Sequence, residues 1–142
     1  MSKYYIAYGS NLNINQMKAR CPAAKPIGKA LLKDYKLVFN THATIVKKVG
    51  AQTPVGVFEI TDACEAALDF YEGYPSYYRK EYIDIDINGN IVRAMVYIMN
   101  EAGLSLPNKS YFADIVDGYD DFGLDLEYLK TALHYTSINC LL

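Results

Sequence analysis

The fold class follows first from residues 78–98, which read YRKEYIDIDINGNIVRAMVYI. Asn88-Gly89 is a strong two-residue turn signal between two alternating runs, so this stretch predicts a β-hairpin. With that loop, the register places Asp84 opposite Arg93 on one face. The other face then carries Ile83, Ile85, Ile87, Val92, Ala94, Val96 and Ile98, which are all apolar.

More strand-like segments precede the hairpin. Residues 3–8 have the aromatic and β-branched content of a strand, and Gly9 breaks it. Lysines, Gly50 and other breakers separate four further segments with strand-like composition. These segments lie near residues 27–32, 35–40, 42–46 and 54–60. Together they indicate an antiparallel set of strands.

Helical patterns interrupt and follow the strands. Asn13 can cap a short helix, with Gln16 completing a capping-box-like pair, and Cys21-Pro22 ends it. Residues 62–71 show apolar side chains at i, i+3, i+4 and i+7, followed by a glycine that can end the helix. Helical spacing returns at about 108–121 and 124–134. The pattern predicts an α+β fold: a small, mixed, mostly antiparallel β-barrel or strongly curved sheet with flanking helices.

Length and charge limit the function classes. A chain of 142 residues with 51% hydrophobic content can build one core, so a single domain over residues 1–142 is expected. The formal charge of -2, with acidic and basic residues interspersed, gives no basic stripe for a nucleic-acid partner. No run approaches the ~20 apolar residues that cross a membrane, and a cytoplasmic protein is expected.

Cysteines, histidines and glycines exclude several chemistries. Cys21, Cys64 and Cys140 show no metal-ligand spacing, so no zinc or other metal site is predicted; they are expected to be reduced thiols, at least two in or near the core. His42 and His134 stand far apart, without a serine or cysteine in a nucleophile setting. No P-loop or dinucleotide fingerprint is present, and a nucleotide cofactor is disfavoured.

Two features could carry chemistry. Tyr8-Gly9-Ser10-Asn11 sits between a strand end and a helix start, where backbone N–H groups can form a nest for a carboxylate or phosphate. The alternative is a plain turn. Glu72, expected as the last residue of its helix before Gly73, opposes the helix dipole, and a cleft of low polarity would raise its pKa toward that of a general base. The alternative is a surface glutamate.

Tyrosines are unevenly distributed along the chain. The chain has 14 tyrosines and no tryptophan, and many of the tyrosines lie between positions 71 and 82. They could line a polar cleft or serve as half-buried packing residues.

Five short motifs, in order, resemble the γ-glutamylcyclotransferase-like family. The chain carries YGSNL at 8–12, PVGV at 54–57, LDFYEG at 68–73, YYR at 77–79 and GLDLEY at 123–128. The last motif resembles the family's Gly-Leu-Pro-x-x-Tyr, with aspartate where proline is common. The family's fold is a small mixed barrel with flanking helices, which agrees with the pattern above.

The resemblance implies a cyclisation without cofactor or metal. The α-amine of a γ-glutamyl amine or γ-glutamyl amino acid attacks its own γ-carbonyl, and the products are 5-oxoproline and a free amine. Glu72 would be the general acid and base. The substrate would be held by the loop Tyr8, Gly9, Ser10, Asn11 and Leu12, with Tyr78 and Tyr128 as pocket walls or hydroxyl donors.

Two other functions remain compatible with this scaffold. One is a non-catalytic binding or regulatory domain that kept the pocket, and the other is an amide-directed acyl or aminoacyl transferase. The leaving amine and the oligomeric state are left open by the sequence.

Overall fold

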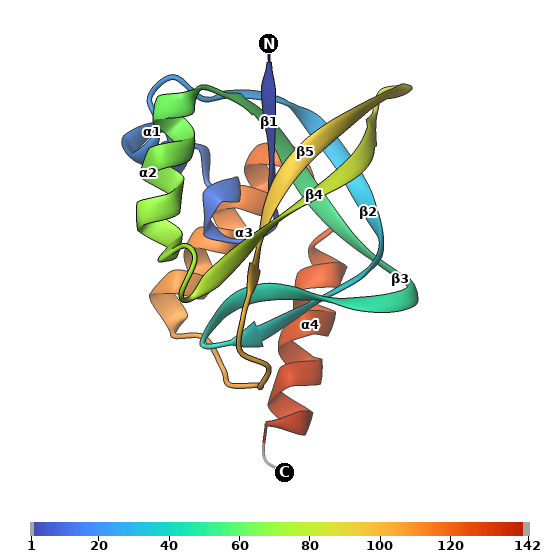
Figure 1. Ribbon diagram of the computed structural model, residues 1–142. Coiled ribbons are helices and arrows are strands. Elements are labelled where there is room, and N and C mark those ends of the chain that lie inside the picture. Colours follow the sequence, from blue (N-terminus) through green and yellow to red (C-terminus); the bar gives the residue numbers. More distant parts are fainter. Residues whose placement is uncertain (1, 141–142) are drawn as a thin grey trace.

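Two long hairpins and one short strand form the sheet in the computed structural model, which describes residues 2–140 (Figure 1). The first hairpin consists of β2 (Lys25–Asn40) and β3 (His42–Ile60), and the second of β4 (Tyr78–Ile87) and β5 (Asn90–Met99). β1 (Lys3–Ala7) lies between them, so the strand order is β2-β3-β1-β5-β4. β1 runs parallel to β5, while the other pairs are antiparallel. The predicted mixed, mostly antiparallel sheet is confirmed.

The second hairpin has the predicted register. Asp84 pairs with Arg93, Ile85 pairs with Val92, and the turn lies at Asn88-Gly89. Asn88 and Gly89 both have positive φ, as a type I′ turn requires. The apolar face turns inward, and the Asp84–Arg93 pair stays exposed.

The strands of the first hairpin are longer than predicted. Four separate strand segments were expected, whereas the structure joins them into two long strands. The lysines and Gly50 do not break the sheet, because a bulge absorbs the irregularity: the register shifts between Lys33 and Tyr35. Asp34 adopts φ 66° there and accepts a hydrogen bond from the N–H of Gly50 at 3.0 Å.

The sheet is strongly curved and remains open. Its two edge strands, β2 and β4, approach each other at one end, where a Cβ on Gly28 would lie 3.3 Å from Ile87. Within residues 2–140 no ladder joins these edges, so of the two predicted forms the curved sheet is correct and the closed barrel is not.

Helices flank this sheet as expected. A 3₁₀ turn, η1 (Ser10–Leu12), leads into α1 (Ile14–Arg20), and α2 (Asp62–Glu72) connects the hairpins. α3 (Lys109–Phe122) and α4 (Leu126–Asn139) follow the sheet. Figure 1 shows α1 and α2 side by side at one edge of the molecule, with α3 behind η1. α4 packs against β2, and η1 contacts both β1 and β3.

The cap of α1 is only half of the predicted capping box. The side chain of Asn13 accepts from the N–H of Gln16 at 3.1 Å, as expected. The N–H of Asn13, however, already donates to the Ser10 carbonyl within the 3₁₀ turn. The side chain of Gln16 is therefore free to accept from Arg20 instead.

Leu12 anchors η1 in the core. Its side chain is fully buried and lies against Gly56 of β3 and Gly118 of α3. A Cβ on Gly118 would come within 2.6 Å of the Leu12 Cβ and 2.7 Å of the Asn13 nitrogen, so only glycine lets α3 approach this closely. Cys21 and Cys64 are buried near this core, as predicted.

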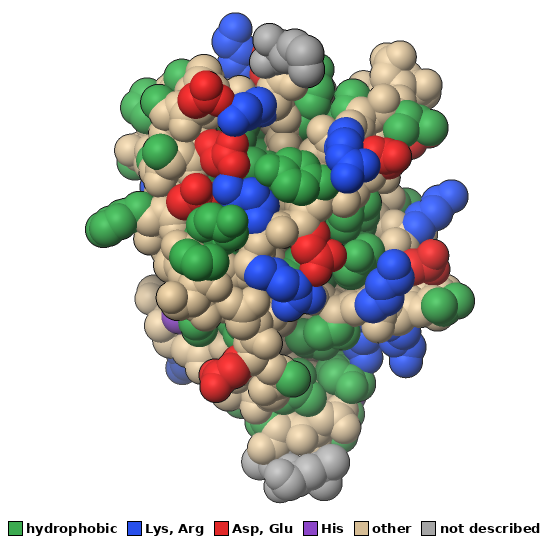
Figure 2. Space-filling model, in the orientation of Figure 1, with side chains coloured by type: hydrophobic (Ala, Val, Ile, Leu, Met, Phe, Trp, Pro, Cys, Tyr) green, Lys and Arg blue, Asp and Glu red, His purple; other side chains and the backbone are tan. Residues whose placement is uncertain are grey.

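Charged side chains of both signs are mixed over the face shown in Figure 2. No helix among the described residues is both long and apolar enough to cross a membrane.

Candidate active site

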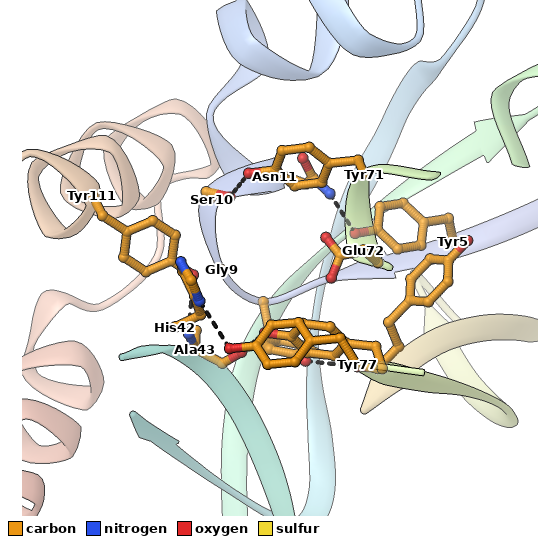
Figure 3. Close-up of a pocket in the computed structure, with 13 residues that line it drawn as sticks. Tyr5, Gly9, Ser10, Asn11, His42, Ala43, Tyr71, Glu72, Tyr77 and Tyr111 are labelled. Carbon is orange, nitrogen blue, oxygen red and sulfur yellow. Dashed lines mark hydrogen bonds between the residues drawn. The ribbon is translucent and has the colours of Figure 1, made fainter. Parts of the chain in front are cut away.

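The loop after β1 and the end of α2 meet at a cavity of about 170 Å³ (Figure 3). More than 60 residues separate them in the sequence. The cavity is lined by tyrosines from several elements together with the loop and two residues from the tip of the first hairpin. The lining residues are Tyr5, Tyr8, Gly9, Ser10, Asn11, His42, Ala43, Tyr71, Glu72, Tyr77, Tyr78, Tyr97 and Tyr111.

Glu72 reaches the cavity because α2 ends where it does. Gly73 takes the left-handed conformation with φ 65°, closes the helix and accounts for the predicted boundary. The carboxyl group of Glu72 points into the space beside Asn11 and Tyr5 (Figure 3). Within residues 2–140 it has no hydrogen-bond partner. Burial raises the pKa of Glu72 to about 7, against the smaller opposing effect of the Arg20 charge.

The loop opposite Glu72 keeps unused backbone donors. The N–H groups of Leu12 and Asn13 donate back to Gly9 and Ser10 and close the 3₁₀ turn. Among residues 2–140, no loop or side-chain hydrogen bond uses the preceding three N–H groups, those of residues 9–11. These donors stand beside the cavity, where an anion could accept from them.

Position 9 requires glycine because atoms of neighbouring residues lie very close to it. The backbone of Gly9 is not in the left-handed region. Its φ is -123°, and a Cβ there would lie 3.1 Å from the Ala43 Cβ and 3.5 Å from the Tyr111 hydroxyl. A side chain at this position would enter the cavity and narrow it.

The tyrosine hydroxyls divide into two groups by how they use their single proton. Tyr8 donates to the Tyr97 carbonyl at 2.6 Å, and Tyr78 donates to the Ala43 carbonyl at 2.7 Å. Tyr5 and Tyr111 instead accept, from the Asn11 amide and the Ala43 N–H, both at 2.9 Å. Burial raises the pKa of all four phenols, so they stay protonated at neutral pH.

Most of the predicted site residues come together here. Tyr8, Gly9, Ser10, Asn11, Tyr78 and Glu72 all line the cavity. Tyr78 is a wall of the cavity, but the proton of its hydroxyl is already engaged, so the expected donor role is not available in this arrangement.

Two predicted site residues do not line the cavity. Leu12 lies beneath the loop as a core anchor. Tyr128 is on α4, where its hydroxyl accepts from Gln52 at 2.7 Å. The GLDLEY motif that suggested Tyr128 is the junction of α3 and α4: Gly123 ends α3 with φ 63°, and Asp125 caps α4.

Sequence reasoning did not single out the remaining lining residues. His42 stands at the tip of the first hairpin, where its Nδ1 lies 3.0 Å from the Tyr77 hydroxyl. Tyr111 comes from the first turn of α3 and packs edge-on to His42. The tyrosine cluster at 71–82 was the one usable signal, and three of its members, Tyr71, Tyr77 and Tyr78, line the cavity.

A nearly buried ion-pair network fixes α2 above the sheet. The Lys80 ammonium group, on a side chain that is 8% exposed, binds the carboxylates of Glu65 and Asp69. The Tyr97 hydroxyl donates to Asp69 from the other side. Asp69 lies about one helical turn before Glu72, so this network joins the part of α2 next to Glu72 to β4 and β5.

The site offers no evident metal ligands. Across the part of the chain that the structure describes, no group of three or more His, Cys, Asp or Glu side chains is arranged to hold a metal ion.

Comparisons with known proteins relate the whole chain to one family. The family model described as "Gamma-glutamyl cyclotransferase, AIG2-like" matches residues 5–114. The bovine protein "Gamma-glutamylcyclotransferase" is 29% identical over 143 aligned positions, covering 89% of this chain and 74% of the relative. A solved structure named "Gamma-glutamyl cyclotransferase" superposes with a TM-score of 0.84 at 27% identity, covering 93% of this chain and 86% of the other. YkqA from Bacillus subtilis, at 21% identity, shares the fold with a TM-score of 0.78 over 96% of this chain and 54% of its own.

Proposed function

Because the chain belongs to the AIG2-like γ-glutamyl cyclotransferase family, we propose that it cyclises a small γ-glutamyl amine or γ-glutamyl amino acid, with Glu72 as general acid and base. The products are 5-oxoproline and a free amine. The observation that supports this proposal is the position of Glu72: a carboxyl group with a pKa of about 7 faces a donor-rich loop across a small cavity.

The cavity suits the glutamyl part of such a substrate. The cavity has a volume of about 170 Å³, and Tyr77, one of its lining residues, is also exposed at the surface, so we place the leaving amine on that side. The three backbone N–H groups of residues 9–11 can receive the α-carboxylate or the oxygen that becomes negative during attack. The Tyr111 hydroxyl accepts from the Ala43 N–H, so its own proton can be donated to the substrate.

Protons and bonds balance around a single carboxylate. Glu72 takes a proton from the α-ammonium group, and the resulting amine attacks the γ-carbonyl carbon and forms the ring C–N bond. Glu72 gives this first proton to the leaving nitrogen as the bond between that nitrogen and the γ-carbonyl carbon breaks. The carboxylate then accepts the second proton from the ring nitrogen and passes it to the departing amine. Two protons leave the α-nitrogen in total, and the free amine carries two more at neutral pH. No water is consumed.

Confinement supplies much of the rate increase in this scheme. The nucleophile is already part of the substrate, so the protein needs only to hold the chain bent, and such tethering is worth ~7 to 11 kcal/mol at its limit. A pKa near neutrality lets one carboxyl both accept and return a proton.

A product assay tests the proposal. The protein is incubated with a panel of γ-glutamyl amino acids and γ-glutamyl amines, and 5-oxoproline and the free amine are quantified. We expect equal amounts of the two products from at least one substrate class. A γ-glutamyl transfer product in place of 5-oxoproline supports the transferase reading, and binding without any product supports the binding-domain reading.

A further inference from the structure

We propose that Arg20, which lies outside the cavity, is a positioning residue that acts on both walls of the site. It orients the Tyr5 hydroxyl through Asn11, and it holds the end of α2 through Tyr71. The inference rests on the proposed function, because the walls are positioned for the cyclisation.

The direction of each hydrogen bond in this chain is fixed by chemistry. A guanidinium group can only donate, so the Arg20 Nη1 contact turns the carbonyl oxygen of the Asn11 amide toward Arg20. The NH₂ group of Asn11 then faces the other way and donates to the Tyr5 hydroxyl at 2.9 Å. A second bond, from Arg20 Nη2 to Gln16 at 2.9 Å, holds the guanidinium plane in place.

The phenol at the end of the chain is left with a free proton. The Tyr5 oxygen accepts from Asn11, so its proton is available to an acceptor in the cavity, either the Glu72 carboxylate or a substrate oxygen. Tyr5 is 5% exposed, so few water molecules compete for that proton. Without Arg20 the Asn11 amide can turn over, and its oxygen would then capture the Tyr5 proton.

The second contact joins Arg20 to the helix that carries Glu72. The guanidinium carbon lies 3.7 Å from the centre of the Tyr71 ring, a stacking distance for a cation on an aromatic face. Tyr71 immediately precedes Glu72, and its hydroxyl lies 3.2 Å from the Ser10 Oγ of the loop. One side chain therefore touches both halves of a site that the sequence separates widely.

A double-mutant cycle on turnover tests the hydrogen-bond chain from Arg20 through Asn11 to Tyr5. Arg20→Met and Tyr5→Phe should each lower kcat roughly ten- to hundredfold, because the substrate or Glu72 loses an oriented donor. The double variant should lose clearly less than the product of the two single losses, since both changes act on one proton. Lys18→Met, an exposed cation on the same helix, should keep the parental kcat. Independent, multiplying losses overturn the proposal, as does a parental kcat in Arg20→Met.

The variant Arg20→Lys tests whether the geometry of the guanidinium group or only its positive charge matters for kcat. Lysine keeps the positive charge but lacks the planar fork that binds Asn11 and Gln16 together and stacks on Tyr71. We expect unchanged thermal unfolding and a loss of kcat close to that of Arg20→Met. Full recovery of kcat with lysine would reject the hydrogen-bond chain.

A titration gives a readout that needs no substrate. The cavity that holds the Glu72 carboxyl is also lined by titratable side chains from the surrounding elements, namely Tyr5, Tyr8, His42, Tyr71, Tyr77, Tyr78, Tyr97 and Tyr111. Arg20 is the cation that opposes the effect of burial on the pKa of Glu72. Carbon-13 NMR of the Glu72 carboxyl should therefore show a higher pKa in Arg20→Met than in the parent, and no change in Lys18→Met.

The two proposals fail in different ways. A parental kcat in Arg20→Met rejects the role of Arg20 even when the parent releases 5-oxoproline. A parent that forms no 5-oxoproline, but in which Arg20→Met raises the Glu72 pKa, rejects the cyclisation and supports the contact between Arg20 and the site.

Discussion

At the residue scale, Glu72 combines an unfavourable position with a specific environment. It stands at the negative end of a helix dipole, is largely enclosed by tyrosines and has no hydrogen-bond partner among the described residues. Each of these features disfavours its charged form. A residue that costs stability in this way is expected where the charge is needed for chemistry.

Replacing Glu72 with glutamine tests that expectation. The amide keeps the size but cannot accept the ammonium proton, so turnover should fall by at least ~10² to 10⁴. Binding of the γ-glutamyl substrate should largely survive, and the free energy of unfolding should stay equal or rise. Steady-state kinetics, calorimetric binding and urea unfolding measure the three effects. Glu127→Gln, at an exposed glutamate on α4, is the matched control and should change none of them.

The pH dependence of stability follows from the same carboxyl. Its pKa is about 7 in the folded protein and ~4.3 in an unfolded chain, so the folded state binds the proton more tightly. The stability that protonated Glu72 contributes is fully present below pH ~4.3 and is lost as pH rises through about 7. The advantage of Glu72→Gln over the parent should therefore grow across this range and level off above it. Urea unfolding at several pH values measures it, and a difference that does not vary with pH contradicts the shift.

At the element scale, features that depend on neighbouring residues could be predicted from the sequence, whereas features that depend on contacts between distant segments could not. The end of α2 could be predicted because helical spacing and the Gly73 terminator lie within one segment, and the β4–β5 register because Asn88-Gly89 fixes it. The length of β2 and β3 could not be predicted, because the bulge at Asp34 that lets their pairing continue depends on contacts between the two strands. His42 and Tyr111 were missed because neither lies near Glu72 in the sequence.

The contact between α3 and η1 gives a prediction at this scale. In Gly118→Ala the new methyl group would press on Leu12 and on the backbone of Asn13, and such overpacking costs roughly 1 to 3 kcal/mol. This outweighs the ~1 kcal/mol that alanine gains in helix propensity. Unfolding measurements should show a net loss, and KM should rise because the loop moves. Asp117→Ala, at the neighbouring exposed position, should show neither effect; a stabilised Gly118→Ala protein would mean that this contact is loose.

At the scale of the whole molecule, α2 must be held in place by both hairpins. It leaves β3 and returns to β4, and the network around Lys80 ties its middle to the second hairpin. Sequence patterns predicted the helix but not this network, because its members belong to three elements. The misplaced Tyr128 has a similar origin: the motif was recognised, but its position depends on how α4 packs.

Lys80→Met should show how much the network contributes. Loss of a nearly buried ammonium group leaves Glu65 and Asp69 with fewer partners, and the free energy of unfolding should fall by roughly 2 to 3 kcal/mol. The kcat should fall as well, because α2 carries Glu72. Lys3→Met is the comparison: Lys3 also pairs with Glu65, but its side chain is 44% exposed, and we expect little change. Equal losses in both variants would mean that burial of Lys80 adds nothing.

The central place of β1 has a consequence for how the chain acquires its structure. Each hairpin can form from neighbouring residues, but β1 pairs with residues 56–60 on one side and with Ala94 and Met95 on the other. Contacts between such distant segments form slowly, because a long loop must close first. During synthesis the pairing of β1 with β5 therefore requires that the second hairpin has left the ribosome, so we expect the surroundings of the loop after β1 to be completed late in folding.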